Sequence, residues 1–119
     1  MKKRIIILCL KMDIYKWNMM EFNKLNKKNS LNIEVHECIN FIYPGANLNH
    51  GKKPKKIKII KFKTFSFWKK YMNRLQTIQY KNEKVIIFDL ISLYNNFGVS
   101  LNIFLLNLFL KNKKIFTIR

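Results

Sequence analysis

Residues 85–88, Val85-Ile86-Ile87-Phe88, form an uninterrupted apolar run between the charged residues Lys84 and Asp89. Such a run is typical of a strand that is buried on both faces of a sheet. A longer apolar segment follows at 90–110, then a lysine-rich break at 111–114, and then a second apolar run at 115–118. Parallel strands need a crossover connection, which is usually a helix. The last third of the chain therefore predicts one strand–helix–strand unit.

The same alternation extends toward the N-terminus. The patterns predict strands at 4–10, 33–43 and 56–63 and helices at 13–28 and 66–79, with Asp13 as the N-cap of the first helix. Pro44 and Gly45 break the second strand, and 46–56 is a polar loop. The order predicts an α/β fold: a Rossmann-like parallel sheet of about five strands with helices on both faces, in a single domain over 1–119.

The charge of the chain is strongly one-sided. The formal net charge is +18, and of 24 basic residues only Arg4, Arg74 and Arg119 are arginines. Such a charge favours polyanions or an anionic membrane surface as partners. Residues that read DNA grooves or hold phosphates in a bidentate manner are more often arginines. Because lysine, asparagine and isoleucine have AT-rich codons, genome composition is an alternative source of this charge.

Two features of the N-terminal half indicate a cytosolic protein. Cys9 and Cys38 both lie in apolar stretches, which predicts two buried, reduced thiols rather than a disulfide framework. The basic residues 2–4 followed by apolar residues 5–10 resemble the start of a signal peptide. The apolar part is too short and no cleavage site of small residues follows, so we expect a first strand there.

The segment 90–110 is long enough for a membrane span, since about 20 apolar residues cross a bilayer. It also contains four amides, at Asn95, Asn96, Asn102 and Asn107. Unpaired amides are costly in hydrocarbon, which favours a buried crossover helix. A small membrane protein spanning at 90–110 stays open as an alternative.

The sequence holds no standard catalytic or cofactor motif, and we expect no cofactor. There is no glycine-rich phosphate loop and no zinc-protease or nucleophile-elbow signature. Glu34, His36 and Cys38 would project from one face of a strand, and His50 would complete a set of four metal ligands. Alternating residues of this kind are more often packed in a core, so no metal site is predicted.

A basic and aromatic block at 52–80 is the segment that most strongly indicates a binding function. At helical spacing Trp68, Tyr71, Leu75 and Ile78 share one stripe. The stripe fits a helix packed on the core, an interfacial helix on an anionic membrane, or aromatic side chains that stack on nucleic-acid bases. The residues predicted to bind a membrane are Lys61, Lys63, Phe67, Trp68, Lys69, Lys70 and Arg74.

Two segments carry a resemblance to a known family. Residues 83–93, EKVIIFDLISL, followed by an apolar helix and by residues 113–119, KKIFTIR, resemble the N-terminal, acceptor-side domain of GT-B glycosyltransferases. Residues 3–8, KRIIIL, are similar to the first strand of that domain. The resemblance implies the N-terminal half of a transferase for surface polysaccharide or lipid-linked sugar, docked on the cytoplasmic face of a membrane. It also implies that the donor-binding domain is a separate partner and that this chain alone is inactive.

The resemblance and the fold class together place candidate substrate-binding residues at the carboxyl ends of the strands. These are Met12, Asp13, Asp89 and Arg119. Asp89 is the candidate catalytic residue, as a base or as an acceptor for a sugar hydroxyl, while Arg119 would hold a phosphate. The alternative role of Asp89 is a helix N-cap. A small basic nucleic-acid binder, whose affinity would fall steeply with salt, is the rival from another class.

Overall fold

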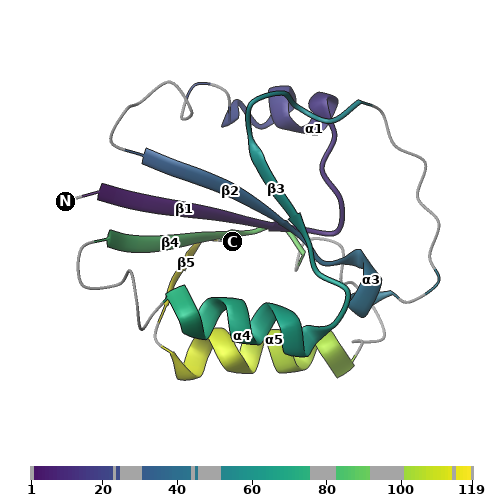
Figure 1. The fold of residues 1–119 in the computed structure, drawn as a ribbon, viewed down its shortest axis with the longest axis vertical. Coiled ribbons are helices and arrows are strands. Elements are labelled where there is room, and N and C mark those ends of the chain that lie inside the picture. The colour runs from purple at the N-terminus through teal and green to yellow at the C-terminus, as the bar shows by residue number, and fades with distance from the viewer. Residues whose placement is uncertain are drawn as a thin grey trace.

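The computed structural model describes residues 2–22, 24, 31–43, 45, 52–75, 83–91, 101–113 and 115–118. Its centre is a five-stranded, all-parallel sheet with the strand order β3-β2-β1-β4-β5 (Figure 1). The strands are β1 (Lys2–Cys9), β2 (Leu31–Glu37), β3 (Lys58–Lys61), β4 (Glu83–Asp89) and β5 (Phe116–Ile118). This order is that of a Rossmann-like, doubly wound sheet. The predicted fold class is confirmed.

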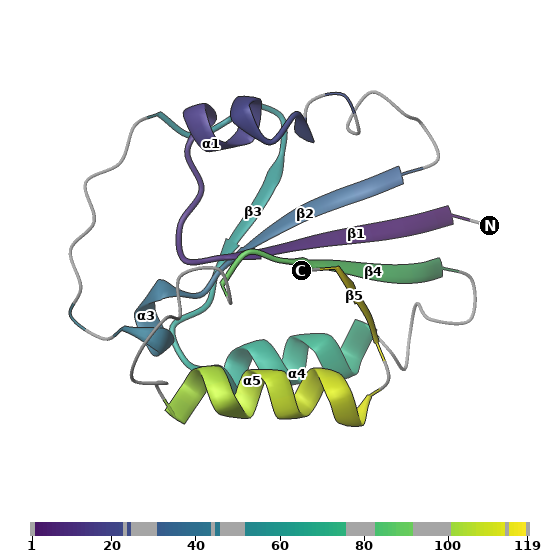
Figure 2. The same cartoon turned by 180° about the vertical axis from the view of Figure 1, so that it is seen from behind.

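Helices cover both faces of the sheet. They are α1 (Ile14–Met19), α3 (Ile39–Ile42), α4 (Phe65–Arg74) and α5 (Leu101–Asn112). Figures 1 and 2 show α4 and α5 side by side on one face, α1 on the opposite face, and α3 near the carboxyl ends of the strands. The strand order reverses between β1 and β4, so their carboxyl ends form the switch point where such sheets bind ligands.

The central strand β1 explains why the apolar runs of the sequence are uninterrupted. Ile6 and Leu8 pack with Trp68 on the face of α4 and α5. Ile5 and Ile7 pack with Trp17 on the face of α1. Because β1 is buried on both sides, it needs apolar residues at consecutive positions, as parallel sheets do.

Two predicted boundaries are wrong, each for a local reason. The strand predicted at 33–43 ends at Glu37, and Ile39–Ile42 form α3. The main-chain amide of Ile39 donates to the carbonyl of Leu10, which turns the chain away from the sheet. The helix predicted at 13–28 is interrupted: α1 ends at Met19, and Glu21 just beyond it has a left-handed φ of 59°, which a continuing right-handed helix cannot contain. Residues 23 and 25–28 of that prediction lie outside the described residues.

The crossover helix lies in the second half of the predicted segment. It begins at Leu101 and ends at Asn112. Residues 92–100, which the prediction also included, lie outside the described residues. No helix in the described parts of the chain is both long and apolar enough to cross a membrane.

Candidate functional site

Helix α4 presents a mostly basic outer face above the sheet. Thr64 caps its N-terminus, because the side-chain oxygen of Thr64 accepts a hydrogen bond from the amide of Phe67 at 3.2 Å. Trp68 and Met72 point into the core and are at most 1% exposed. The exposed residues of the helix include Phe67, Lys69, Lys70 and Arg74.

The described residues of the aromatic stripe predicted on this helix pack on the core, which is one of the three interpretations given above: Trp68 and Leu75 are buried, and Tyr71 is half-buried against them. Trp68 is fully buried, and its ring contacts the rings of Phe65 and Phe109. An interfacial helix needs its apolar face free to enter the lipid, so a contact of Trp68 with a membrane would require this buried ring to leave the core. Leu75 is also buried, while Ile78 lies outside the described residues.

A groove of about 560 Å³ runs between α4 and the edge strand β3. Four of its described lining residues are cationic: Lys61 at the end of β3, Lys63 just after that strand, and Lys70 and Arg74 from α4. Phe67, on the rim, is 59% exposed. We call this the β3–α4 groove, and its lining residues are Ile60, Lys61, Phe62, Lys63, Phe67, Lys70, Tyr71 and Arg74. Five of the seven residues predicted to bind a membrane thus share one surface, and Lys69 lies outside the groove, where it lines a second pocket beside α5.

Among the side chains that the structure describes, no carboxylate is found in an ion pair with Lys61, Lys63 or Lys70. Glu34, Glu37 and Asp89 are at most 2% exposed. Asp13 caps α1 and Glu21 follows that helix, on the opposite face of the sheet (Figure 1). The exposed lysines of the groove therefore contribute a positive potential, which attracts anions.

A buried polar network supports the floor of the groove. Glu34 accepts hydrogen bonds from Arg4 at 3.1 Å and from the Tyr71 hydroxyl at 3.0 Å. The ammonium of Lys58 lies 3.6 Å from Glu34, its partner in the β2–β3 register. Tyr71 therefore links the lining of the groove to a charged group inside the fold.

His36 completes this network. Its Nδ1 accepts the indole N–H of Trp68 at 3.1 Å, so the ring hydrogen lies on Nε2 and is donated to Glu34 at 3.1 Å. With both ring nitrogens occupied, His36 has no free atom for a metal ion. No group of three metal-ligating side chains occurs in the described part of the chain, and His50 falls outside it.

The network shifts the pKa values of its members. Burial raises the pKa of the Glu34 carboxyl, but the hydrogen bond from His36 and the charge of Arg4 outweigh burial, and the pKa is lowered. Burial lowers the pKa of His36, which stays neutral. Burial and the Glu34 charge raise the pKa of Tyr71 to about 12, so its hydroxyl keeps the proton that it donates.

These shifts predict that stability falls with acidification. A pKa that is lower in the folded than in the unfolded chain gives stability that is present above the unfolded pKa and lost as pH falls. For His36 the loss begins near its ordinary pKa of 6.5, and for Glu34 near 4.5. Thermal unfolding followed by circular dichroism should show Tm falling in these two steps. His36→Gln should remove the first step and His50→Gln should keep it; a first step that survives His36→Gln would contradict the assignment.

Three of the predicted substrate residues, Met12, Asp13 and Asp89, lie at the carboxyl edge of the sheet, and each already has local partners. Asp13 is the N-cap of α1, as predicted, and accepts from the Lys16 amide at 2.7 Å. Asp89 is 1% exposed and accepts from the amide of Ile91 at 3.0 Å. Met12 is fully buried. The side chains of Met12 and Asp89 are thus buried, their role in binding a substrate stays a prediction, and Arg119 lies outside the described residues.

Sequence reasoning missed Glu37, which lies at the same edge. Its Oε2 accepts the amide of Met12 at 2.8 Å and contacts the ammonium of Lys53. Glu37 is the last residue of β2, a position that would have placed it at the carboxyl edge of the sheet. The prediction of a strand that continues to residue 43 hid this position.

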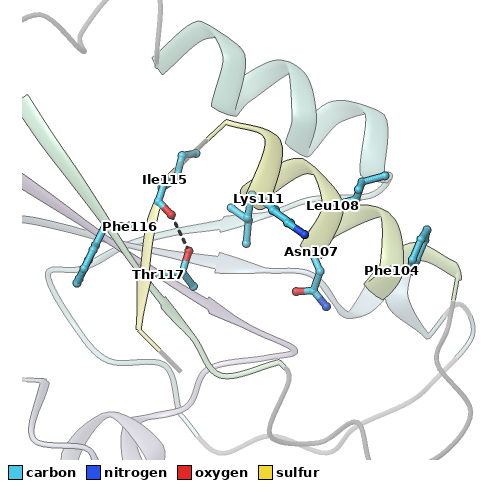
Figure 3. Close-up of a pocket in the computed structure, with 8 residues that line it drawn as sticks. Phe104, Asn107, Leu108, Lys111, Ile115, Phe116 and Thr117 are labelled. Atoms are coloured by element: carbon cyan, nitrogen blue, oxygen red, sulfur yellow. Dashed lines mark hydrogen bonds between the residues drawn. The ribbon is translucent and has the colours of Figure 1, made fainter.

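A larger pocket of about 770 Å³ lies between α5 and the other edge strand, β5 (Figure 3). Its surroundings include the exposed side chains of Phe104, Leu108 and Phe116. Phe116 and Thr117 point to opposite sides of β5, and the Thr117 hydroxyl donates to the Ile115 carbonyl at 3.1 Å (Figure 3). Among its described lining residues this pocket has one cation, Lys111, and no acid, so the described part of its surface is mainly apolar.

Comparison of the chain with family models, curated proteins and solved structures finds no match. The resemblance to GT-B glycosyltransferases accordingly stays a prediction from the sequence segments quoted above.

Proposed function

We propose that this Rossmann-like domain docks on an anionic membrane surface through the β3–α4 groove. The observation that carries the proposal is the convergence of the exposed lysines Lys61, Lys63 and Lys70 on one groove, which Arg74 also lines. Each lysine or arginine near an anionic bilayer contributes about 1 kcal/mol of attraction. The exposed ring of Phe67 adds an apolar side chain that can enter the headgroup region.

The lining of the groove favours a membrane over a nucleic acid. Binding of single strands relies on several exposed aromatic rings that stack on successive bases. Of the aromatic residues in the groove, Phe62 is 5% exposed and Tyr71 is held by Glu34, which leaves Phe67 as the exposed ring. Lysines, which outnumber arginine here, act as compact point charges that need no fixed base edge.

Sedimentation with vesicles tests the proposal. The intact chain should bind phosphatidylcholine vesicles that contain phosphatidylglycerol and should not bind vesicles of phosphatidylcholine alone. Binding should weaken at high salt, because the Debye length falls from about 8 Å at 0.15 M to about 3 Å at 1 M. Tighter binding to an oligonucleotide than to the anionic vesicles, at the same salt, would instead favour the nucleic-acid alternative.

Phe67→Ser separates the apolar contribution from charge. Full burial of a phenylalanine in an apolar environment contributes about 1.5–3 kcal/mol. If the Phe67 ring enters the headgroup region only in part, Phe67→Ser should weaken vesicle binding by about tenfold. Because Phe67 is 59% exposed, the free energy of unfolding should change by less than about 0.5 kcal/mol. Tyr15→Ser, at a 72% exposed position of α1, is the control and should leave vesicle binding unchanged.

We further propose that the docked domain is the acceptor-side half of a glycosyltransferase on the cytoplasmic face of the membrane. The Rossmann-like strand order and the free thiols of Cys9 and Cys38 support this. The apolar surface around Phe104 and Phe116 supports a partner domain. Vesicles that carry a polyprenyl-phosphate sugar should bind the chain more tightly than vesicles of equal charge without it. Sugar transfer by the chain alone would contradict the assignment of donor binding to another domain.

A further inference from the structure

One buried carboxylate oxygen has no protein partner in the described part of the chain. Glu37 is 2% exposed, and its Oε2 accepts from the Met12 amide and contacts Lys53. Its Oε1 is buried and accepts no hydrogen bond from any described residue. Buried polar atoms in native proteins almost always have a partner, so an open carboxylate oxygen indicates that something else supplies the donor.

The open oxygen belongs to a residue that lines a small cavity at the carboxyl edge of the sheet. The cavity measures about 50 Å³, and Lys11, Glu37, Ile39, Asn40 and Lys61 line it. Glu37 ends β2 and Lys61 ends β3, and the two are paired in the parallel register. Open α/β sheets bind their ligands at this edge. At about 30 Å³ of liquid volume per water molecule, the cavity holds a group as small as one hydroxymethyl.

The charges around the cavity select the kind of donor. Lys11 and Lys61 line it together with Glu37, and Lys53 already contacts the same carboxylate. Two further ammonium groups disfavour a cationic ligand, and a lone carboxylate is a poor site for a divalent metal ion. A neutral hydroxyl fits the open oxygen, and an anion fits the two lysines.

We infer that this cavity binds a phosphate ester of a polyhydroxy compound. One hydroxyl of the ligand donates to Glu37 Oε1, while its phosphate lies outside the cavity between Lys11 and Lys61. Lys61 also lines the β3–α4 groove, which joins the cavity to the surface proposed to meet the membrane. The ligand is therefore either a soluble polyol phosphate or a lipid headgroup of the same chemistry; the lipid case rests on the proposed docking.

Calorimetric titration with glycerol 3-phosphate, compared with methyl phosphate, tests the soluble case. Glycerol 3-phosphate should bind about tenfold more tightly than methyl phosphate, because one of its hydroxyls can donate a hydrogen bond to the charged carboxylate, and one such bond contributes about that much. Glu37→Gln should remove this preference. Asn40→Leu, which fills the cavity without changing the carboxylate, should remove it too, whereas Asn18→Leu on α1 should keep it.

Vesicles containing phosphatidylglycerol, compared with vesicles containing phosphatidylmethanol of the same charge, test the lipid case. Preference for phosphatidylglycerol that is lost in Asn40→Leu supports a headgroup ligand. Equal binding to both vesicles, with a preference among the soluble esters, supports a soluble ligand. Equal binding of the two soluble esters, together with equal binding of the two kinds of vesicle, overturns the inference, because the cavity then holds only water. That result leaves membrane docking intact. Absence of vesicle binding overturns the docking, and the soluble titration still decides the cavity.

Discussion

Trp68→Ala is expected to lower the free energy of unfolding by about 3–5 kcal/mol, the cost of removing a large buried aromatic side chain. Trp68 is fully buried between the sheet and α5, where its ring packs against Phe109 with 5.3 Å between centroids. The substitution also removes the donor to His36 Nδ1 and leaves that nitrogen unpaired. Because small domains are stable by about 5–15 kcal/mol, this loss is a large fraction of the free energy of unfolding.

Urea unfolding followed by circular dichroism measures the loss in the free energy of unfolding. A second variant, Trp68→Phe, separates the contribution of packing from that of the hydrogen bond. The phenylalanine variant keeps most of the packing and loses the hydrogen bond, so we expect a cost of about 1–3 kcal/mol. The neighbouring variant Phe67→Ser is the control, since its side chain is exposed. A cost below about 1 kcal/mol for Trp68→Ala would mean that α4 does not pack on the sheet through this residue.

The second large effect is expected at the β3–α4 groove. Combined replacement of Lys61, Lys63 and Lys70 by glutamine should weaken binding to phosphatidylglycerol vesicles by about 3 kcal/mol, on the order of 100-fold, at about 1 kcal/mol per lysine. All three are exposed, so folding should be unaffected. Vesicle sedimentation at about 0.15 M salt gives the partition coefficient.

The matched control variant makes the same change in net charge at lysines outside the groove. Lys3, Lys24 and Lys111 are exposed lysines outside the groove, and their combined replacement by glutamine removes the same charge. This control variant should retain most of the vesicle binding. Equal losses in both variants would show that net charge alone, rather than the groove, attracts the chain to the membrane.

The sequence was sufficient to predict the sheet because a parallel strand buried on both faces needs consecutive apolar residues. The runs at 5–8 and 85–88 have that property, and both form central strands. The end of β2 could not be predicted in this way. Ile39, Phe41 and Ile42 are as apolar as a strand, and the turn into α3 depends on an amide contact with Leu10.

The candidate site was predicted in part. Local sequence brings Lys61 and Lys63 near Phe67, and the groove contains all three. The inward direction of Trp68 depends on a partner 32 positions away, His36, and on packing with α5. Glu37 was missed because its importance arises from an unpaired oxygen, which sequence patterns do not report.

A fluorescent label at the rim of the groove gives the most direct test of membrane docking. Phe67→Cys labelled with the environment-sensitive dye NBD places the probe on the face proposed to meet lipid. Tyr15→Cys, labelled in the same way, places it on α1, across the sheet. Cys9 and Cys38 are fully buried, and burial raises the pKa of Cys9 to about 12, so these thiols react slowly. On phosphatidylglycerol vesicles, a blue shift and a gain in emission at position 67 and none at position 15 are predicted. Equal responses at both positions, or a response at 15 alone, would contradict docking through the β3–α4 groove.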